Sequence, residues 1–178
     1  MSGLVTRNRL IGLALAALIV IIDQAVKWYV IKVLSLREVG HVDLLSFFDF
    51  TYTENRGISL GLLEATSMES RWLLVAMTAA IAVVVLVWMM REKLLGDIAA
   101  LALILGGALG NIRDRFEFGY VIDYADFHIG DFRPFLIFNI ADAAITIGVV
   151  IILARSLFVR DKDATDTGDT PRGETDNA

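Results

Sequence analysis

Apolar residues gather in four long blocks along this chain, at about residues 10–31, 72–90, 97–112 and 135–158. An α-helix needs about 20 apolar residues to cross the hydrocarbon core of a bilayer, and these blocks approach or exceed that length. The few polar residues after the second block leave room for only a tight connection to the third, which predicts an antiparallel helical hairpin. We therefore predict a mainly α membrane protein with four transmembrane helices and both termini on the same side.

The segments between these blocks have a different pattern. Residues 42–45, 47–53 and 120–127 are rich in β-branched and aromatic side chains, which is typical of strands. These segments predict a small extramembrane β-lobe that is built from about 32–70 and 113–134. The chain is then a single membrane domain with one accessory lobe.

Shorter signals mark the ends of these segments. Pro134 predicts the entry to the fourth helix, and residues 66–69, Thr-Ser-Met-Glu, fit a capping box ahead of the second. The aromatic run at 47–50 predicts that part of the lobe rests on the bilayer surface. The membrane domain is expected over 1–160, and the polar tail at 161–178 is expected to be disordered and cytoplasmic.

The composition supports lipid as the solvent of this protein. The chain has 178 residues and is 56% hydrophobic, whereas soluble domains are roughly 45–50% apolar. It contains no cysteine, which excludes disulfides and thiolate metal sites. His41 and His128 are far apart and predict no catalytic zinc, so we expect neither a metal nor a cofactor. No basic stripe with interleaved aromatic residues is present, which argues against nucleic-acid binding.

The distribution of basic residues predicts the orientation. Lys and Arg are enriched on the cytoplasmic side of membrane proteins. Compact basic groups flank the termini and the short helical connection, at Arg7/Arg9, Arg91/Lys93 and Arg155/Arg160/Lys162. We therefore predict cytoplasmic N and C termini and a lobe on the outer side.

Asp142 is the first candidate for chemistry, because it lies near the start of the fourth apolar block with Asn139 on the same helical face. Ionisable residues in membrane segments usually face a partner or a cavity. With the predicted topology, Asp123 in the second extramembrane segment lies at the same level. Two carboxyls that share a site hold one proton between them, and the ionised one can activate water. Spacing alone leaves Asp114 or Asp126 open in place of Asp123, and a helix-end Asp142 that only meets water also remains open.

Other polar residues lie near the same predicted membrane border. Asp23 and Lys27 are spaced i, i+4 with the acid first, which favours a structural ion pair. Asn111 and Arg115 share a helical face after a Gly106–Gly110 stretch, which is itself typical of close helix packing. These residues are candidates for the frame of a site.

Five ordered motifs then resemble bacterial lipoprotein signal peptidase (signal peptidase II) from about residue 10 to residue 158. The motifs are Asp23-Gln24-x-x-Lys27, Asn55-x-Gly57, Gly106-Gly107-Ala108-x-Gly110-Asn111-x-x-Asp114-Arg115, Val121-x-Asp123 and Phe138-Asn139-x-Ala141-Asp142-x-x-Ile145-x-x-Gly148. The resemblance implies a four-helix inner-membrane aspartyl protease with a periplasmic β-lobe. Such enzymes remove signal peptides from prolipoproteins by cutting before the diacylglyceryl-modified cysteine.

The resemblance also implies a role for each matched residue. It makes Asp123 and Asp142 the catalytic pair at the periplasmic face. It makes Asn111, Arg115 and Asn139 groups that line the site. It places Asn55 and Gly57 in a loop that closes over the substrate. It gives Asp23, Lys27 and Asp114 a structural role. The implied partners are lipidated prolipoproteins and membrane lipid, and the expected state is a monomer.

Three other functions fit parts of the sequence. A serine–lysine peptidase would use Ser46 or Ser59 with Lys27, although no serine lies in a motif of its own. A proton-coupled transporter also uses carboxylates inside the membrane. A lipid-binding assembly factor would need no catalytic residue at all. Asp→Asn variants would separate the serine–lysine peptidase from an aspartic one. A flux assay in liposomes would identify a transporter.

Overall fold

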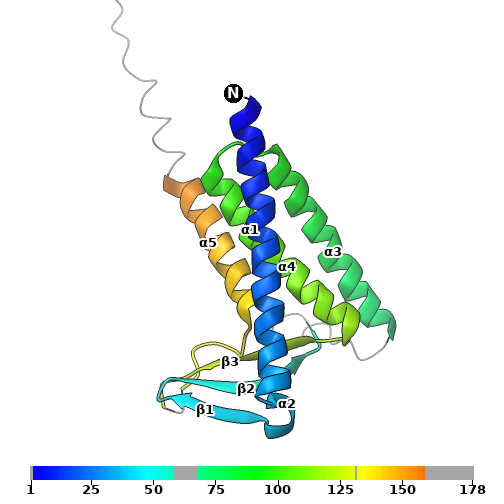
Figure 1. The fold of residues 1–178 in the computed structure, drawn as a ribbon, viewed down its shortest axis with the longest axis vertical. Coiled ribbons are helices and arrows are strands. Elements are labelled where there is room, and N and C mark those ends of the chain that lie inside the picture. The colour runs from blue at the N-terminus through cyan, green and yellow to red at the C-terminus, as the bar shows by residue number, and fades with distance from the viewer. Residues whose placement is uncertain (1, 58–67, 131, 159–178) are drawn as a thin grey trace, which may run out of the picture.

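The computed structural model describes residues 2–57, 68–130 and 132–158. Four long helices lie side by side with a small sheet across one end (Figure 1). They are α1 (Ser2–Trp28), α3 (Met68–Arg91), α4 (Leu95–Glu117) and α5 (Ile140–Phe158). Each is long and apolar enough to cross a membrane, which confirms the predicted four-helix architecture. Thr66, Ser67 and the tail 161–178, for which a cap and disorder were predicted, lie outside the described residues.

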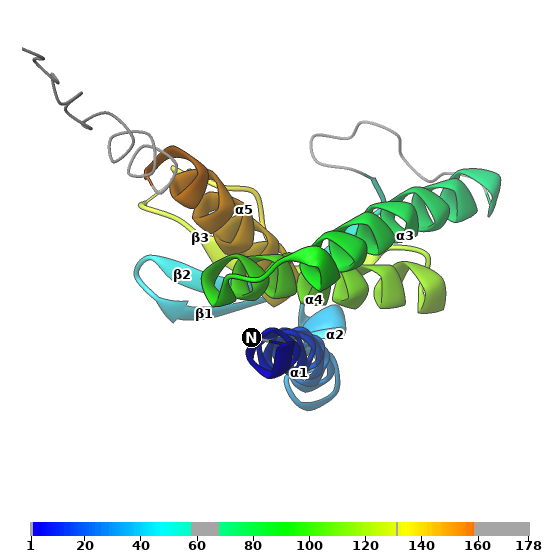
Figure 2. The same ribbon diagram turned by 90° about the horizontal axis from the view of Figure 1, so that it is seen from above.

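Helix α4 is the centre of the bundle, with α1, α3 and α5 packed around it (Figure 2). Its glycines allow this arrangement. A Cβ at Gly106 would lie 2.7 Å from the carbonyl oxygen of Ala16, and a Cβ at Gly107 would collide with the carbonyl oxygen of Ala141. The predicted packing role of the glycine stretch therefore holds for the contacts of α4 with both α1 and α5.

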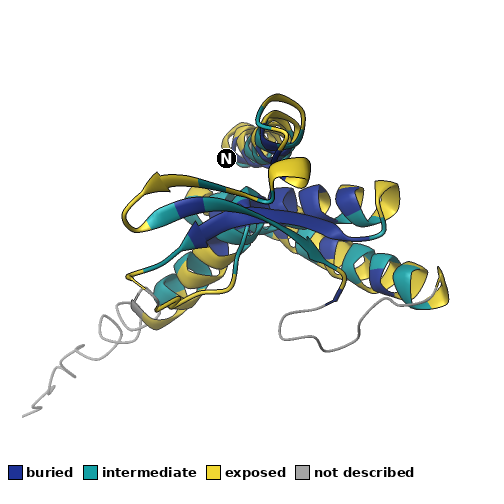
Figure 3. Cartoon of the chain, turned by 90° about the horizontal axis from the view of Figure 1, so that it is seen from below, coloured by how far each residue is buried: buried dark blue, intermediate teal, exposed yellow. Residues whose placement is uncertain are grey.

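The sheet contains β1 (His41–Leu45), β2 (Phe48–Asn55) and β3 (Val121–Phe127) in antiparallel order β1-β2-β3. Together with α2 (Leu36–Val39) and the π-helical turn η1 (Tyr29–Val33) that extends α1, it forms the sheet lobe. β3 is the most buried strand and lies against the helix ends (Figure 3). The predicted β-lobe is thus present.

The three crowded phenylalanines differ in their surroundings. Phe48 and Phe50 are half-buried and pack against a cluster that contains Tyr124, with the rings of Phe50 and Tyr124 edge to face at 5.7 Å. Phe47 is 46% exposed. The contact of this part of the lobe with the bilayer stays a prediction, and Phe47 is the residue of the three that is most available for it.

Three helices differ clearly from the predicted bounds. The first begins at Ser2, earlier than the predicted residue 10. The fourth transmembrane helix begins at Ile140, later than the predicted residue 135, because Phe138 is still paired with Ala125 of β3. The third runs beyond the predicted residue 112 to Glu117 and so carries the polar residues that follow the glycines.

Candidate active site

Asp123 and Asp142 meet where the sheet lobe joins the helices. Asp123 lies in the middle of β3 and is 2% exposed. Asp142 lies in the first turn of α5 and is half-buried. Both carboxyls accept hydrogen bonds from Asn139, Asp123 from its side chain and Asp142 from its backbone amide.

Two asparagines join these carboxyls. The Nδ2 of Asn139 donates to Asp123 Oδ1 at 2.6 Å and also to Asn111 Oδ1 at 3.3 Å. Asn111 in turn donates from its Nδ2 to Asp142 Oδ1 at 2.8 Å. The chain of contacts Asp123–Asn139–Asn111–Asp142 fixes the side-chain orientation of both acids. The backbone amide of Asp142 assigns the side-chain amide of Asn139, because this N–H must meet the oxygen and not the nitrogen.

Asn139 and Asp142 also cap α5. The backbone amide of Asp142 donates to Asn139 Oδ1 at 2.9 Å, and the backbone amide of Asn139 donates to Asp142 Oδ2 at 3.3 Å. This reciprocal pattern is a capping box at the N-cap and N3 positions. The start of α5 is therefore set by the same two residues that shape the site, which explains why the helix does not begin at Pro134.

The pKa of Asp123 is raised, and burial is the largest cause. Burial first, and then the nearby charge of Asp142, raise the pKa of the Asp123 carboxyl from 3.8 to about 7, although hydrogen bonds from Asn55 and Asn139 act in the opposite direction. A carboxyl with a pKa near neutrality is poised for proton transfer. The electrostatics thus fit two acids that hold one proton.

The open side of the site is bordered by β2 and α4. Asn55 donates from Nδ2 to Asp123 Oδ2 at 3.1 Å, and its own Oδ1 accepts from the amide of Gly57 at 3.2 Å. Arg115 donates to the Gly57 carbonyl at 3.1 Å. Asn55 therefore lies directly on the acid pair, whereas Gly57 and Arg115 hold the chain beside it.

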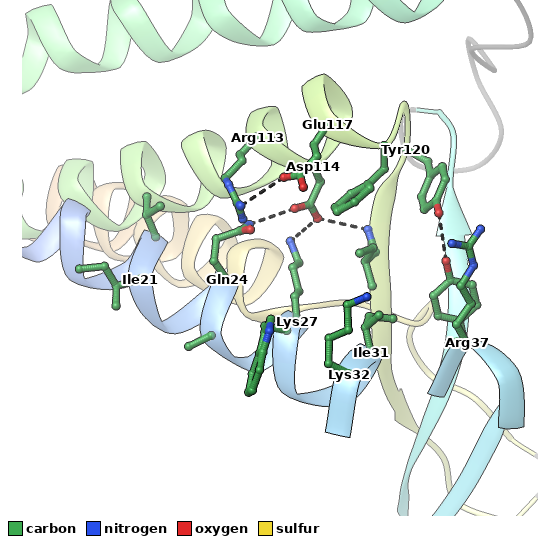
Figure 4. A pocket seen from close by; sticks show the side chains of 16 residues that line it. Ile21, Gln24, Lys27, Ile31, Lys32, Arg37, Arg113, Asp114, Glu117 and Tyr120 are labelled. Atoms are coloured by element: carbon green, nitrogen blue, oxygen red, sulfur yellow. Dashed lines mark hydrogen bonds and ion pairs between the residues drawn. The ribbon is translucent and has the colours of Figure 1, made fainter. Parts of the chain in front are cut away.

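A second polar cluster, Asp23, Lys27 and Asp114, supports the pair from behind. The ammonium of Lys27 lies 2.9 Å from Asp23 Oδ2. It also lies 2.7 Å from Asp114 Oδ2 (Figure 4). All three side chains are almost completely buried. Breaking such a group by removal of one partner leaves an uncompensated charge in the interior.

This cluster reaches the acid pair through backbone amides. Asp23 Oδ1 accepts from the amide of Ala141 at 3.1 Å, and Asp114 Oδ2 accepts from the amide of Ile122 at 3.3 Å. Each of these amides belongs to the residue just before one of the two acids. Lys27 therefore ties together the backbone positions of both acids and also donates to Asn111 Oδ1 at 3.4 Å.

Gln24 and Gly110 belong to this support, although sequence reasoning did not place them in the site. Gln24 donates to Asp23 Oδ2 at 3.0 Å and to Asp114 Oδ1 at 2.9 Å. A Cβ at Gly110 would lie 2.7 Å from Asp23 Oδ2. The spacing Asp23-Gln24-x-x-Lys27 contained the signal for Gln24, since residues three apart share a helical face.

A cavity of about 690 Å³ opens on the α1 side of this cluster. Gln24, Lys27 and Asp114 line it (Figure 4), whereas neither acid of the pair does. The cavity therefore lies behind the support cluster and not over the acids.

The fold and this site define a multi-pass membrane protein with a carboxyl pair at one end of its helices. The sequence model of signal peptidase (SPase) II matches residues 15–158. The chain belongs to the signal peptidase II family, and it is accordingly a protease and a multi-pass protein of bacterial membranes.

Individual relatives agree along nearly the whole chain. The lipoprotein signal peptidase of Sphingopyxis alaskensis is 55% identical over 151 residues, which cover 85% of this chain and 87% of that protein. That of Rhizorhabdus wittichii is 51% identical over 154 residues, which cover 86% and 90%. A solved bacterial membrane enzyme has a TM-score of 0.72 at 27% identity and covers 91% of this chain and 94% of its own. These similarities do not support the transporter alternative.

Proposed function

We propose that this chain removes signal peptides from prolipoproteins as an aspartic peptidase, with Asp123 and Asp142 activating water. The observation that carries the proposal is the convergence of both carboxyls on the Asn111–Asn139 bridge. The names of its relatives, which are lipoprotein signal peptidases, supply the substrate class.

The two acids have different tasks in this mechanism. Asp123 holds the proton, because burial and the charge of Asp142 raise its pKa to about 7. Asp142 is the base, and both of its oxygens accept N–H groups that hold the carboxylate in place. Asp142 takes a proton from water as the water attacks the scissile carbonyl, while the Asp123 hydroxyl donates a hydrogen bond to that carbonyl oxygen.

The surrounding residues position these groups. Asn111 and Asn139 orient the carboxyls, and Asn55 lies where it reaches both Asp123 and an incoming peptide backbone. Arg115 holds the Gly57 carbonyl at the border of the site. The Lys27 cluster carries no reacting atom and sets the backbone on which the acids stand.

The same reasoning assigns a membrane orientation. Basic residues lie at the end of the bundle away from the sheet, near the start of α1 and in the α3–α4 connection (Figure 1). The positive-inside rule then makes that end cytoplasmic and the sheet lobe periplasmic, in the inner membrane. Acyl chains on the substrate would remain in the bilayer beside the helices while the peptide reaches the acids at the border.

Lys27 disfavours the serine–lysine alternative. A lysine that acts as a general base must be neutral, whereas the ammonium of Lys27 is held between two buried carboxylates at 2.9 and 2.7 Å. Ser46 is exposed at the turn between β1 and β2. Ser59 lies outside the described residues, so its variant is included in the test below.

The decisive experiment is cleavage of a purified lipidated prolipoprotein, followed by gel shift. Asp123→Asn and Asp142→Asn are expected to abolish cleavage, and Ser59→Ala is expected to retain it. Asp97→Asn is the matched control, because this carboxyl pairs with Arg155 at the opposite end of the bundle. Cleavage by both site variants, with Asp97→Asn unaffected, would refute the aspartic mechanism. Absence of cleavage by the wild type would refute the assignment of prolipoproteins as the substrate.

A further inference from the structure

Both histidines of the chain face one carboxylate on the sheet lobe. His41 Nε2 lies 3.0 Å from Asp43 Oδ1 and 3.6 Å from Asp49 Oδ2, and His128 Nε2 lies 2.8 Å from the same Asp49 oxygen. The register of β1 and β2 pairs Asp43 with Asp49 and His41 with Thr51. These side chains therefore project from one face of the sheet, since residues two apart in a strand share a face.

Hydrogen bonds fix the tautomer of His41. Thr51 donates its only hydroxyl hydrogen to Asp126 Oδ2 at 3.1 Å, so the Thr51 oxygen accepts from His41 Nδ1 at 2.8 Å. The proton of a neutral His41 ring is thus on Nδ1, and Nε2 presents a lone pair. Nε2 is therefore the ring atom that faces oxygens of Asp43 and Asp49.

The basic groups that contact these two carboxylates are the imidazoles of His41 and His128. Among the described residues, no Lys or Arg forms an ion pair with Asp43 or Asp49. Asp49 is buried, and its Oδ1 accepts from the amide of Leu44 at 3.1 Å, which orients the carboxylate. A divalent ion between the two carboxylates would supply a counter-charge that no described lysine or arginine supplies.

We propose that His41, Asp43 and Asp49 form a binding site for a divalent transition metal ion such as zinc. Their ligand atoms lie within 4.8 Å of one another. Tetrahedral zinc bonds of about 2.0–2.2 Å place ligand atoms about 3.4 Å apart, and His41 Nε2 lies 3.0 Å and 3.6 Å from the two carboxylate oxygens. Imidazole with carboxylate favours zinc, nickel or copper over calcium and magnesium. The Nδ1–H of His41 is already bonded to an oxygen, as is usual for a metal-bound histidine.

His128 is a positioning residue for this site. It contacts the ligating oxygen of Asp49 from the segment after β3, so it orients the carboxylate from outside the coordination shell. The ion would connect β1 and β2 directly and reach the end of β3 through His128. Because β2 and β3 carry Asn55 and Asp123, the metal would stabilise the lobe that supports the acid pair.

The test is zinc binding to the full-length protein in detergent, measured by competition with a fluorescent zinc chelator. The wild type is expected to bind one ion per chain, and His41→Ala and Asp49→Asn are expected to lose it. His128→Gln is expected to weaken affinity by roughly tenfold or more, as for other outer-shell partners. Glu38→Gln, which removes an exposed carboxylate from α2 of the same lobe, is the control and is expected to bind normally.

X-ray absorption of the zinc-loaded wild type gives a second readout that needs no variant. The expected spectrum shows N and O ligands with the scattering pattern of one imidazole. A spectrum without imidazole, or His41→Ala that binds zinc as the wild type does, would overturn the proposal. Binding is measured without substrate and can be repeated in Asp123→Asn, so the result is independent of the proposed peptidase mechanism.

Discussion

Replacing Asp123 by Asn should change how the stability of this protein depends on pH. In the wild type, burial and the charge of Asp142 raise the pKa of Asp123 from 3.8 to about 7. Between these values the unfolded chain is ionised at this residue while the folded chain keeps the proton. Because the folded state binds more protons, the free energy of unfolding falls as the pH rises through this window.

The size of the effect follows from the shift. Each pKa unit corresponds to about 1.4 kcal/mol, so a change from 3.8 to about 7 removes about 4 kcal/mol of stability across the window. An asparagine has no such dependence. It still accepts from Asn139 but presents an N–H to Asn55, which costs about 1–3 kcal/mol at every pH. The variant should therefore be less stable than the wild type in acid and more stable in mild alkali.

Thermal unfolding in detergent micelles from about pH 4 to about pH 8 measures this crossover. Asp142→Asn is the companion variant, because it removes the charge but leaves the burial of Asp123. Its stability should level off at a lower pH than that of the wild type. The pKa assignment would be refuted if the difference in Tm between wild type and Asp123→Asn stayed constant over the whole range. Neither the raised pKa of Asp123 nor its role as the protonated acid would then hold.

Three further results are expected. Initial rates of prolipoprotein cleavage should fall as the pH rises through about 7, because Asp123 then loses the proton that it donates; rates that rise through this range would contradict the assignment. Gly107→Ala should lower stability by about 1–3 kcal/mol and reduce cleavage, because the new methyl group collides with the carbonyl of Ala141. Gly3→Ala, whose Cβ meets nothing within 4 Å, is its control in the same thermal assay. Lys27→Met should cost about 3–5 kcal/mol in thermal or denaturant unfolding, since it leaves buried carboxylates unpaired; an unchanged Tm would remove Lys27 from the support cluster.

Much of the frame was predictable because lipid imposes strict rules on sequence. Long apolar blocks predict helices wherever backbone groups cannot reach water, and four such blocks give four helices. The position of Asp142 near a helix start was readable for the same reason. Its partner was not, since Asp114 and Asp126 had equal claims by spacing. The structure separates them by contact: Asp114 pairs with Lys27, and Asp126 pairs with Arg133.

The features that sequence reasoning missed depend on contacts between distant segments. The start of α5 was misplaced because Phe138 pairs with Ala125, and such bridges leave no local pattern. The meeting of His41 with His128 at Asp49 depends on the register of three strands. The amides of Ile122 and Ala141 could not be assigned to Asp114 and Asp23, because backbone donors are the same in every sequence.

The cap on α5 has a practical consequence for anyone who disables this enzyme. One oxygen of Asp142 closes the first turn of the helix through the amide of Asn139, while the other faces Asn111. An alanine at this position removes the reactive carboxyl and also the cap of the helix. Loss of activity in Asp142→Ala would therefore not separate the chemical effect from the structural one. Asparagine keeps an oxygen for the turn but presents an N–H to the Nδ2 of Asn111. An inhibitor that drew the carboxylate of Asp142 toward itself would break the hydrogen bond to the Asn139 amide and so open the first turn of α5.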